Sequence, residues 1–415
     1  MDANDSIMRE MSTALTESPY AWLRLTASLA LMTLGGVAMY GVTVALPAVQ
    51  AEFGVARADA ALPYTLTMIG FGIGGILMGK LADRYGVIVP VVLGALGLGS
   101  GLILAGMSGS VVQFAIAHGL LAGLLGCSAT FAPLVADVSL WFTRRRGIAV
   151  AIVISGNYLA GAVWPPILQH LFDSYGWRPT YIGVGIFSIV VMLALALVLR
   201  RRPPAIGATT ATTVEAKPER PLGLSPTALT VLLSIAGVAC CVAMSMPQVH
   251  IVAYCGDLGY RPARGAEMLS LMLGFGLISR VTGGYFADRI GGVATLLISS
   301  ALQGFALFLY LFFDGLFSLY VISALFGLFQ GSIVPMYAIV VREYFAPGEA
   351  GTRLGVVLLA TLGGMALGGW MSGLIFDLTG SYQAAFLNGL GWNLINVSIV
   401  GWLLFRSGRR SLVTA

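Results

Sequence analysis

The chain contains twelve runs of mostly apolar residues, each long enough to cross a lipid bilayer. A helix that spans ~30 Å of hydrocarbon needs ~20 apolar residues. The runs lie near 25–48, 62–82, 87–107, 112–138, 148–171, 180–199, 226–253, 266–286, 293–313, 316–341, 353–376 and 384–405. Strands of a membrane barrel are only ~10 residues of alternating polarity, so a barrel is excluded. The runs predict an all-α membrane protein with twelve transmembrane helices.

The composition argues against a soluble protein. Hydrophobic residues make up 58% of the 415 residues and charged residues only 10%, whereas soluble domains carry about 25% charged residues. The net charge is +5, but the basic residues lie at the ends of apolar runs, where they mark topology and do not indicate nucleic acid. The four cysteines show no metal-ligand spacing, and no nucleophile–base set is visible. We expect no metal, no cofactor, no nucleic-acid partner and no enzymatic activity.

A polar segment at residues 200–224 divides the twelve runs into two groups of six. We expect it to be a cytoplasmic linker between an N-terminal bundle (25–199) and a C-terminal bundle (225–405). Residues 1–24 and 406–415 would then be a cytoplasmic N-terminal segment and a cytoplasmic tail. With both termini inside, 18 Lys and Arg residues face the cytoplasm and 4 face outside, as the positive-inside rule requires.

The two halves of the chain repeat each other. The sequence GKLADRYG at 79–86 returns as GYFADRIG at 284–291, an offset of 205 residues. The sequence LFDSYG at 171–176 returns as IFDLTG at 375–380, an offset of 204 residues. Landmarks that keep one order and nearly one offset indicate a duplicated six-helix unit. We therefore predict two pseudo-symmetric six-helix bundles.

Arg280 is the one basic residue that lies well inside an apolar run. It stands eight residues before Asp288, or ~12 Å along a helix, which is too deep for easy snorkelling. An arginine near the bilayer centre costs at least ~2.5–3.5 kcal/mol, so it needs an aqueous cavity or a partner. A planar guanidinium can hold a carboxylate through two hydrogen bonds. We expect a substrate-carboxylate clamp; the alternative is a structural ion pair with another helix.

Other polar residues in the apolar runs could complete a binding site. His250 ends a run after Pro247, and an unperturbed histidine with a pKa of ~6.5 exchanges protons near neutral pH. A satisfied helix-end histidine is the alternative. His118 is a weaker candidate of the same kind. The remaining candidates are uncharged residues that could instead form interhelical hydrogen bonds: Tyr40, Asn157, Tyr158, Gln330, Tyr337 and Asn393.

Paired acidic and basic residues mark the loops between helices. Asp83 precedes Arg84, and Asp288 precedes Arg289 at the equivalent place in the second half. Arg146 closes a run of three arginines before the fifth helix, and Asp137 lies two turns before that run. We expect the arginine run to act mainly in topology, Arg146 to join a gate, and Asp137 to pair with the run.

The loop motif G-x-x-x-D-R-x-G, its echo after the eighth helix and the six-plus-six plan resemble the major facilitator superfamily. More narrowly, the chain resembles the bacterial monocarboxylate porter and oxalate/formate antiporter group. That likeness lies in Trp141–Ala149, Ser155-Gly156, Pro247–His250 and Arg280. The resemblance implies an inner (plasma) membrane protein whose bundles rock about a midplane cavity bordered by Arg280 and His250. It also implies that the Asp–Arg loops lock the inner gate.

Animal monocarboxylate porters place an acid one turn before the arginine, where this chain has Gly276. The resemblance implies a monomeric secondary transporter of small organic monocarboxylates, coupled to protons. Two alternatives stay open: an organic anion exchanger of the oxalate/formate type, and a membrane sensor that keeps the fold without transport.

Overall fold

The computed structural model describes residues 17–201 and 221–413, and their dominant element is the helix. Twelve helical segments in this part of the chain are long and apolar enough to cross a membrane. Most of the predicted linker and N-terminal segment lies outside the described residues. The helices of the first half are α2 (Pro19–Gly35), α3 (Val37–Phe53), α4 (Arg57–Tyr85), α5 (Ile88–Gly106), α6 (Val111–Ile116), η1 (Ala117–Cys127), α7 (Ala132–Trp141), α8 (Arg146–Tyr175), α9 (Trp177–Ala196) and η2 (Leu197–Arg200). Those of the second half are η3 (Pro221–Gly223), α10 (Pro226–Asp257), α11 (Pro262–Ile290), α12 (Gly292–Leu309), α13 (Leu316–Gln330), α14 (Ile333–Tyr344), α15 (Pro347–Thr379) and α16 (Tyr382–Val413).

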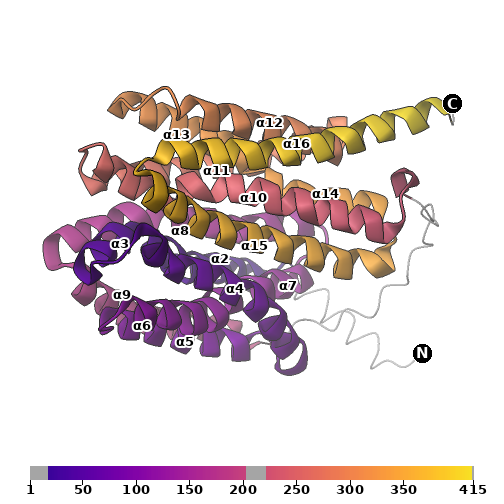
Figure 1. The fold of residues 1–415 in the computed structure, drawn as a ribbon. Coiled ribbons are helices and arrows are strands. Elements are labelled where there is room, and N and C mark those ends of the chain that lie inside the picture. The colour runs from indigo at the N-terminus through magenta and orange to yellow at the C-terminus, as the bar shows by residue number, and fades with distance from the viewer. Residues whose placement is uncertain (1–16, 202–220, 414–415) are drawn as a thin grey trace, which may run out of the picture.

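The helices form two bundles that lie side by side, one from each half of the chain (Figure 1). The helices α2–α9 make the indigo-to-magenta bundle, and α10–α16 make the red-to-yellow bundle. The helix α16, in yellow, runs toward the right of Figure 1 and ends there. We call this the terminal end of the molecule and the opposite one the far end. The predicted fold class, twelve transmembrane helices in two six-helix bundles, is confirmed.

Three of the twelve spans are broken, which the apolar runs did not predict. The first span breaks between α2 and α3 at Gly36, the fourth contains the π-helix η1, and the tenth breaks between α13 and α14. The last break lies at a close backbone contact. A Cβ atom on Gly331 would lie 2.2 Å from the carbonyl oxygen of Gly276 on α11, so only glycine lets these two backbones meet.

The bundles touch along two main helix pairs, α4 with α15 and α8 with α11, and along a smaller contact of α3 with α10. Small residues bring α4 and α15 together near the far end, where a Cβ atom on Gly373 would lie 2.9 Å from the Cα atom of Ala58. Toward the terminal end the same helices diverge. Cβ positions built on Gly79 of α4 and Gly355 of α15 have no neighbouring atom within 4 Å. The two helices are therefore in close contact at the far end, whereas these two positions on them face open space toward the terminal end.

Candidate functional site

Arg280 of α11 reaches across the bundle interface onto α8. Its Cζ atom lies 3.9 Å from the centre of the Tyr158 ring, and Nη1 lies 3.5 Å from the carbonyl oxygen of Ile154. None of the ion pairs between described residues includes Arg280. Its buried Nε atom has no hydrogen-bond partner. The guanidinium is thus held by a ring face and keeps donors free for an anion.

Gly276 explains how the Tyr158 ring reaches Arg280. A Cβ atom on Gly276 would lie 2.3 Å from Cε1 of Tyr158, far inside any tolerable contact. The missing side chain leaves a notch on α11 that the ring from α8 fills. A neutral aromatic ring therefore occupies the place, one turn from the arginine, where a carboxylate partner could otherwise stand. Cation–π contacts of this kind are worth about 0.5–2 kcal/mol, depending on desolvation.

Tyr40 and Asn157, two of the candidate residues in the first bundle, lie in the same region. The hydroxyl of Tyr40 donates to Oδ1 of Asn157 at 3.1 Å, and Asn157 is the chain neighbour of Tyr158. Tyr40 packs over Gly161 of α8, where a Cβ atom would meet its Cζ atom at 2.8 Å and Leu273 of α11 at 2.1 Å. These polar groups from α3 and α8 lie beside the α8–α11 contact that holds Arg280.

Gln330 lies at the break between α13 and α14 that packs against Gly276. Its Oε1 atom accepts from Nε2 of Gln248 on α10 at 2.8 Å, and its own Nε2 atom is buried without a partner. Ser279 of α11 accepts from the backbone N–H of Ser332 at 3.1 Å. Gln330 therefore supplies a second free buried donor near the level of Arg280.

The other predicted polar residues lie elsewhere. Tyr337 donates to Asn396 at 3.0 Å, and Asn393 donates to the carbonyl oxygen of Ser300 at 3.1 Å, so both join helices within the second bundle. His118 is buried among Phe114 and Tyr181, and neither of its ring nitrogens has a partner.

A groove of about 400 Å³ lies between α8 and α11. Glu267 and Ser270 line it, but Arg280 does not.

His250 lies at a different depth from Arg280. It stands seven residues before the far end of α10, about 10 Å along the helix, whereas Arg280 is roughly 27 Å from the far end of α11. His250 is 0% exposed. Its Nδ1 atom lies 2.9 Å from the Tyr382 hydroxyl and its Nε2 atom 2.8 Å from the Gly369 carbonyl oxygen. His250 belongs to a network at the far end.

That network, which we call the far-end lock, consists of Arg57, Asp257, Asp377, Tyr382 and His250. Arg57 forms two hydrogen bonds with the carboxylate of Asp257, at 3.0 and 3.1 Å, and donates to the Tyr382 hydroxyl at 2.7 Å. Asp377 accepts from the backbone N–H groups of Arg57 and Ala58, both at 2.8 Å. One helix of the first bundle is thereby tied to α10, α15 and α16 of the second.

The sequence analysis did not predict the far-end lock, although the sequence contains one indication of it. Arg57 is the first residue of α4, and a cation at a helix N-terminus opposes the helix dipole. Such a placement indicates nearby acids, here Asp257 and Asp377. Asp377 was visible only as part of the internal repeat; its counterpart Asp173 instead accepts from Gln169 at 2.8 Å within α8.

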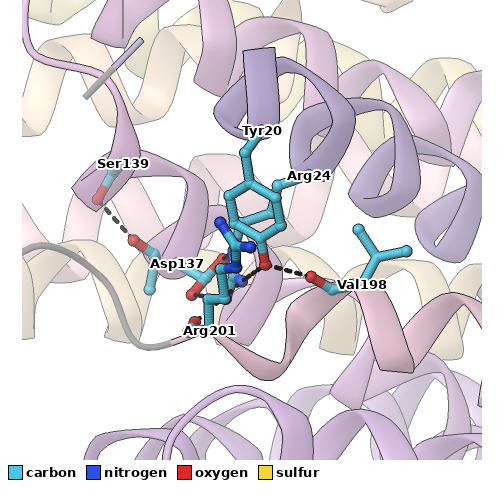
Figure 2. Close-up of polar contacts among 7 residues, drawn as sticks. Tyr20, Arg24, Asp137, Ser139, Val198 and Arg201 are labelled. Atoms are coloured by element: carbon cyan, nitrogen blue, oxygen red, sulfur yellow. Dashed lines mark hydrogen bonds and ion pairs between the residues drawn. The ribbon is translucent and has the colours of Figure 1, made fainter. Parts of the chain in front are cut away.

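The predicted pairing of Asp137 with the arginine run is wrong. Asp137 forms two hydrogen bonds of 2.7 Å with Arg24 of α2, and both side chains are buried (Figure 2). Arg24 also donates to Tyr20 and to the carbonyl oxygen of Arg201, and its Cζ atom lies 4.7 Å from the Trp141 ring centre. The chain leaves α7 in an extended conformation at Phe142. This turn carries residues 143–147 into solvent and away from Asp137.

The predicted gate residues at the terminal end are exposed. Asp83, Arg84, Asp288 and Arg289 all lie at the surface, and none takes part in an ion pair between described residues. Arg146 is also exposed and lies 3.4 Å from the Ser139 hydroxyl. Their exposure agrees with the open space around Gly79 and Gly355 at this end.

Comparison with known proteins gives the family. The profile of the Major Facilitator Superfamily matches residues 27–291 and, again, 231–414. Monocarboxylate transporter 13 of Bos taurus is 29% identical over 337 residues, which cover 79% of this chain and 75% of the relative. Agnestins efflux protein AgnL12 of Paecilomyces divaricatus is 25% identical, covering 68% of this chain and 63% of the relative.

Solved structures show the same fold. A bacterial homologue of the human lysosomal transporter Spinster, in an inward-facing and occupied conformation, gives a TM-score of 0.69 at 18% identity, covering 96% of this chain and 97% of that one. The nucleoside transporter NupG gives a TM-score of 0.71 at 13% identity, covering 91% of this chain and 99% of that one. The chain belongs to the Major Facilitator Superfamily.

Proposed function

We propose that the protein is a secondary transporter that carries small organic monocarboxylates by alternating access and uses the proton gradient. One observation carries the proposal. Arg280 holds a charge deep in the bilayer-spanning region, an aromatic ring and not an acid supports it, and its Nε atom has no partner. A charge so costly to bury is retained for function, and the ligand that suits a guanidinium edge is a carboxylate.

The comparisons and the bundle arrangement support this proposal. The relatives of Bos taurus and Rattus norvegicus are named as monocarboxylate transporters. We take the terminal end as cytoplasmic because 18 of the 23 basic residues fall there or in the polar segments joined to it. The described conformation is then closed to the outside and open to the cytoplasm, with the Asp83 and Asp288 loops released.

The number of cations at the depth of Arg280 predicts which substrates bind. A dicarboxylate needs two positive partners, because an uncompensated buried carboxylate costs several kcal/mol. The nearest basic residue on α15, Arg353, is bound to Glu349 and Thr230 near the terminal end. We therefore expect singly charged carboxylates to be preferred over oxalate, malonate or succinate.

Uptake into proteoliposomes tests both the function and this preference. Labelled lactate or pyruvate should enter faster with an inward proton gradient. Unlabelled monocarboxylates should compete at concentrations at which dicarboxylates do not, compared as ionised species at fixed pH. Uptake that requires a counter-anion inside, regardless of the proton gradient, would indicate exchange instead. No uptake of any carboxylate by monodisperse protein would favour a sensor.

The notch at Gly276 gives a second prediction. In Gly276→Ala the added Cβ atom would displace the Tyr158 ring, so Arg280 would lose its support. We expect the apparent substrate affinity to fall by roughly threefold to thirtyfold, the equivalent of a cation–π contact. Affinity is measured from the concentration dependence of uptake.

Gly274→Ala is the matched control, since it lies on the same helix and its Cβ atom would meet only Ala162, at 3.9 Å. Tyr158→Leu should weaken binding like Gly276→Ala, because it removes the ring without a clash. A Gly276→Ala transporter with unchanged affinity would show that the ring does not position Arg280.

A further inference from the structure

The hydrogen bonds of His250 specify its protonation state in the closed far-end lock. The carbonyl oxygen of Gly369 can only accept, so the Nε2 atom of His250, 2.8 Å away, must carry a proton. The Nδ1 atom of a neutral ring then accepts, and its partner is the Tyr382 hydroxyl at 2.9 Å. The oxygen of Tyr382 in turn accepts from Nη1 of Arg57 at 2.7 Å. In these three hydrogen bonds every donor meets an acceptor.

A second proton on His250 breaks this order. The Nδ1 atom would become a donor facing a hydroxyl that is itself donating, so the hydroxyl must turn away. The single Tyr382 oxygen would then have to accept from both Arg57 and His250. Two cations would share one oxygen at a buried site, where like charges repel strongly. The contact between Arg57 and Tyr382 is the one that the added charge weakens.

Other charged and titratable groups lie on the helices around His250. On α4 these are Arg57 and Tyr64, on α15 Asp377, and on α10 itself Tyr254 and Asp257. Asp377 is committed to the N-terminus of α4, and Asp257 is committed to Arg57. The helices α3 and α11 also pack on α10, but their far-end acids, Glu52 and Glu267, pair with Arg178 and Arg264. No carboxylate in this described region is therefore hydrogen-bonded to His250 to offset its charge.

We propose that His250 is a proton site that controls the far-end lock: the neutral ring stabilises the closed state, and protonation favours opening. The cross-bundle location makes this possible, because Arg57 belongs to the first bundle and His250 and Tyr382 to the second. Protons at the far end would then be bound more tightly by the open state than by the closed one, as linkage requires. The proposal rests on alternating access in the proposed function but not on the identity of the substrate.

The test measures far-end opening directly, without substrate. Ala51 of α3 and Gln383 of α16 are exposed at the far ends of the two bundles. Both are replaced by cysteine and spin-labelled; the native cysteines are buried. The distances between the two labels are measured by pulsed electron paramagnetic resonance in nanodiscs. The measurement is made at about pH 7.5 and about pH 5, on either side of an ordinary histidine pKa. We expect a longer-distance population to grow as the pH falls, by at most about tenfold per pH unit for one titrating group.

Two variants and one control test whether protonation of His250 causes the opening. His250→Gln offers a neutral amide that can donate to Gly369 and accept from Tyr382, so the distances should stay short at both pH values. Tyr382→Phe removes the shared oxygen, so the open population should rise at both pH values and its pH dependence should be lost. His170→Gln changes an exposed histidine of α8 and should keep the wild-type response.

The proposal is overturned if the wild type shows no change or closes as the pH falls. It is also overturned if His250→Gln responds to pH as the wild type does. Should His250→Gln not purify as a monodisperse protein, the response of Tyr382→Phe decides the question by the same measurement. Failure of carboxylate uptake in proteoliposomes would contradict the proposed function but leave this result standing.

Discussion

Replacement of Arg280 by methionine should abolish carboxylate uptake and leave the substrate-free protein at least as stable as the wild type. Methionine keeps the volume of the stem and removes the charge. A charge at this depth costs about 2.5–3.5 kcal/mol, and only a ring face and a carbonyl oxygen at 3.5 Å compensate it here. A residue that supported the fold would behave in the opposite way. Uptake and thermal unfolding of the same preparation are the measurements.

The size of the binding effect follows from the lost hydrogen bonds. Hydrogen bonds to a charged group are worth about 1.5–3 kcal/mol each, so loss of two should weaken substrate binding by more than about a hundredfold. Arg280→Lys should recover little, because an ammonium cannot present two parallel donors. Arg264→Met is the control on the same helix, as Arg264 is exposed and pairs with Glu267 at the far end.

Two results would contradict the role of Arg280. Near-normal uptake by a well-expressed Arg280→Met would reject the carboxylate clamp. A large fall in unfolding temperature, with loss of both activity and monodispersity, would instead make Arg280 a structural residue of the α8–α11 contact.

The fold was predictable because the features that determine it can be read directly from the sequence. Apolar runs of bilayer length, a charge asymmetry between loops and an internal repeat need no knowledge of tertiary contacts. The position of Arg280 within a membrane-spanning helix was predictable for a related reason. A charge within an apolar run is unusual whatever surrounds it. The breaks at Gly36 and Gly331 were not predictable. They depend on which backbone lies opposite, and a glycine-rich membrane sequence offers many equivalent positions.

Partners across helices were the part that sequence reasoning could not supply. Asp137 has three arginines close by in the chain, yet it pairs with Arg24, which is 113 residues away. Nearness in sequence predicts pairing within one helix. Here the turn at Phe142 ends α7 and directs the arginines away from Asp137. The far-end lock joins positions up to 325 residues apart. His250 was recognised as a candidate, but its depth and its bond to Tyr382 require the packed bundles.

The buried pair of Arg24 and Asp137 gives the largest expected effect on stability. Both groups are at most 6% exposed, and two hydrogen bonds of 2.7 Å join them. Asp137→Ala would leave the guanidinium of Arg24 buried without its anion. Breaking one partner of such a pair costs about 3–5 kcal/mol, so we expect the unfolding temperature to fall by roughly 10 °C. The measurement is thermal unfolding of detergent-purified protein, with Ser139→Ala, a half-buried neighbour on α7, as the control.

A double variant separates the cost of an orphaned charge from the value of the pair itself. Replacing a buried ion pair by apolar residues of similar size is often neutral or stabilising. Arg24→Met combined with Asp137→Leu should therefore recover most of the stability that Asp137→Ala loses, while Arg24→Met alone should not, since it strands the carboxylate. Arg24 also holds the carbonyl oxygen of Arg201, where η2 leads into the segment between the bundles. If the double variant is as unstable as either single change, the pair stabilises the first bundle through this contact and not through mutual neutralisation.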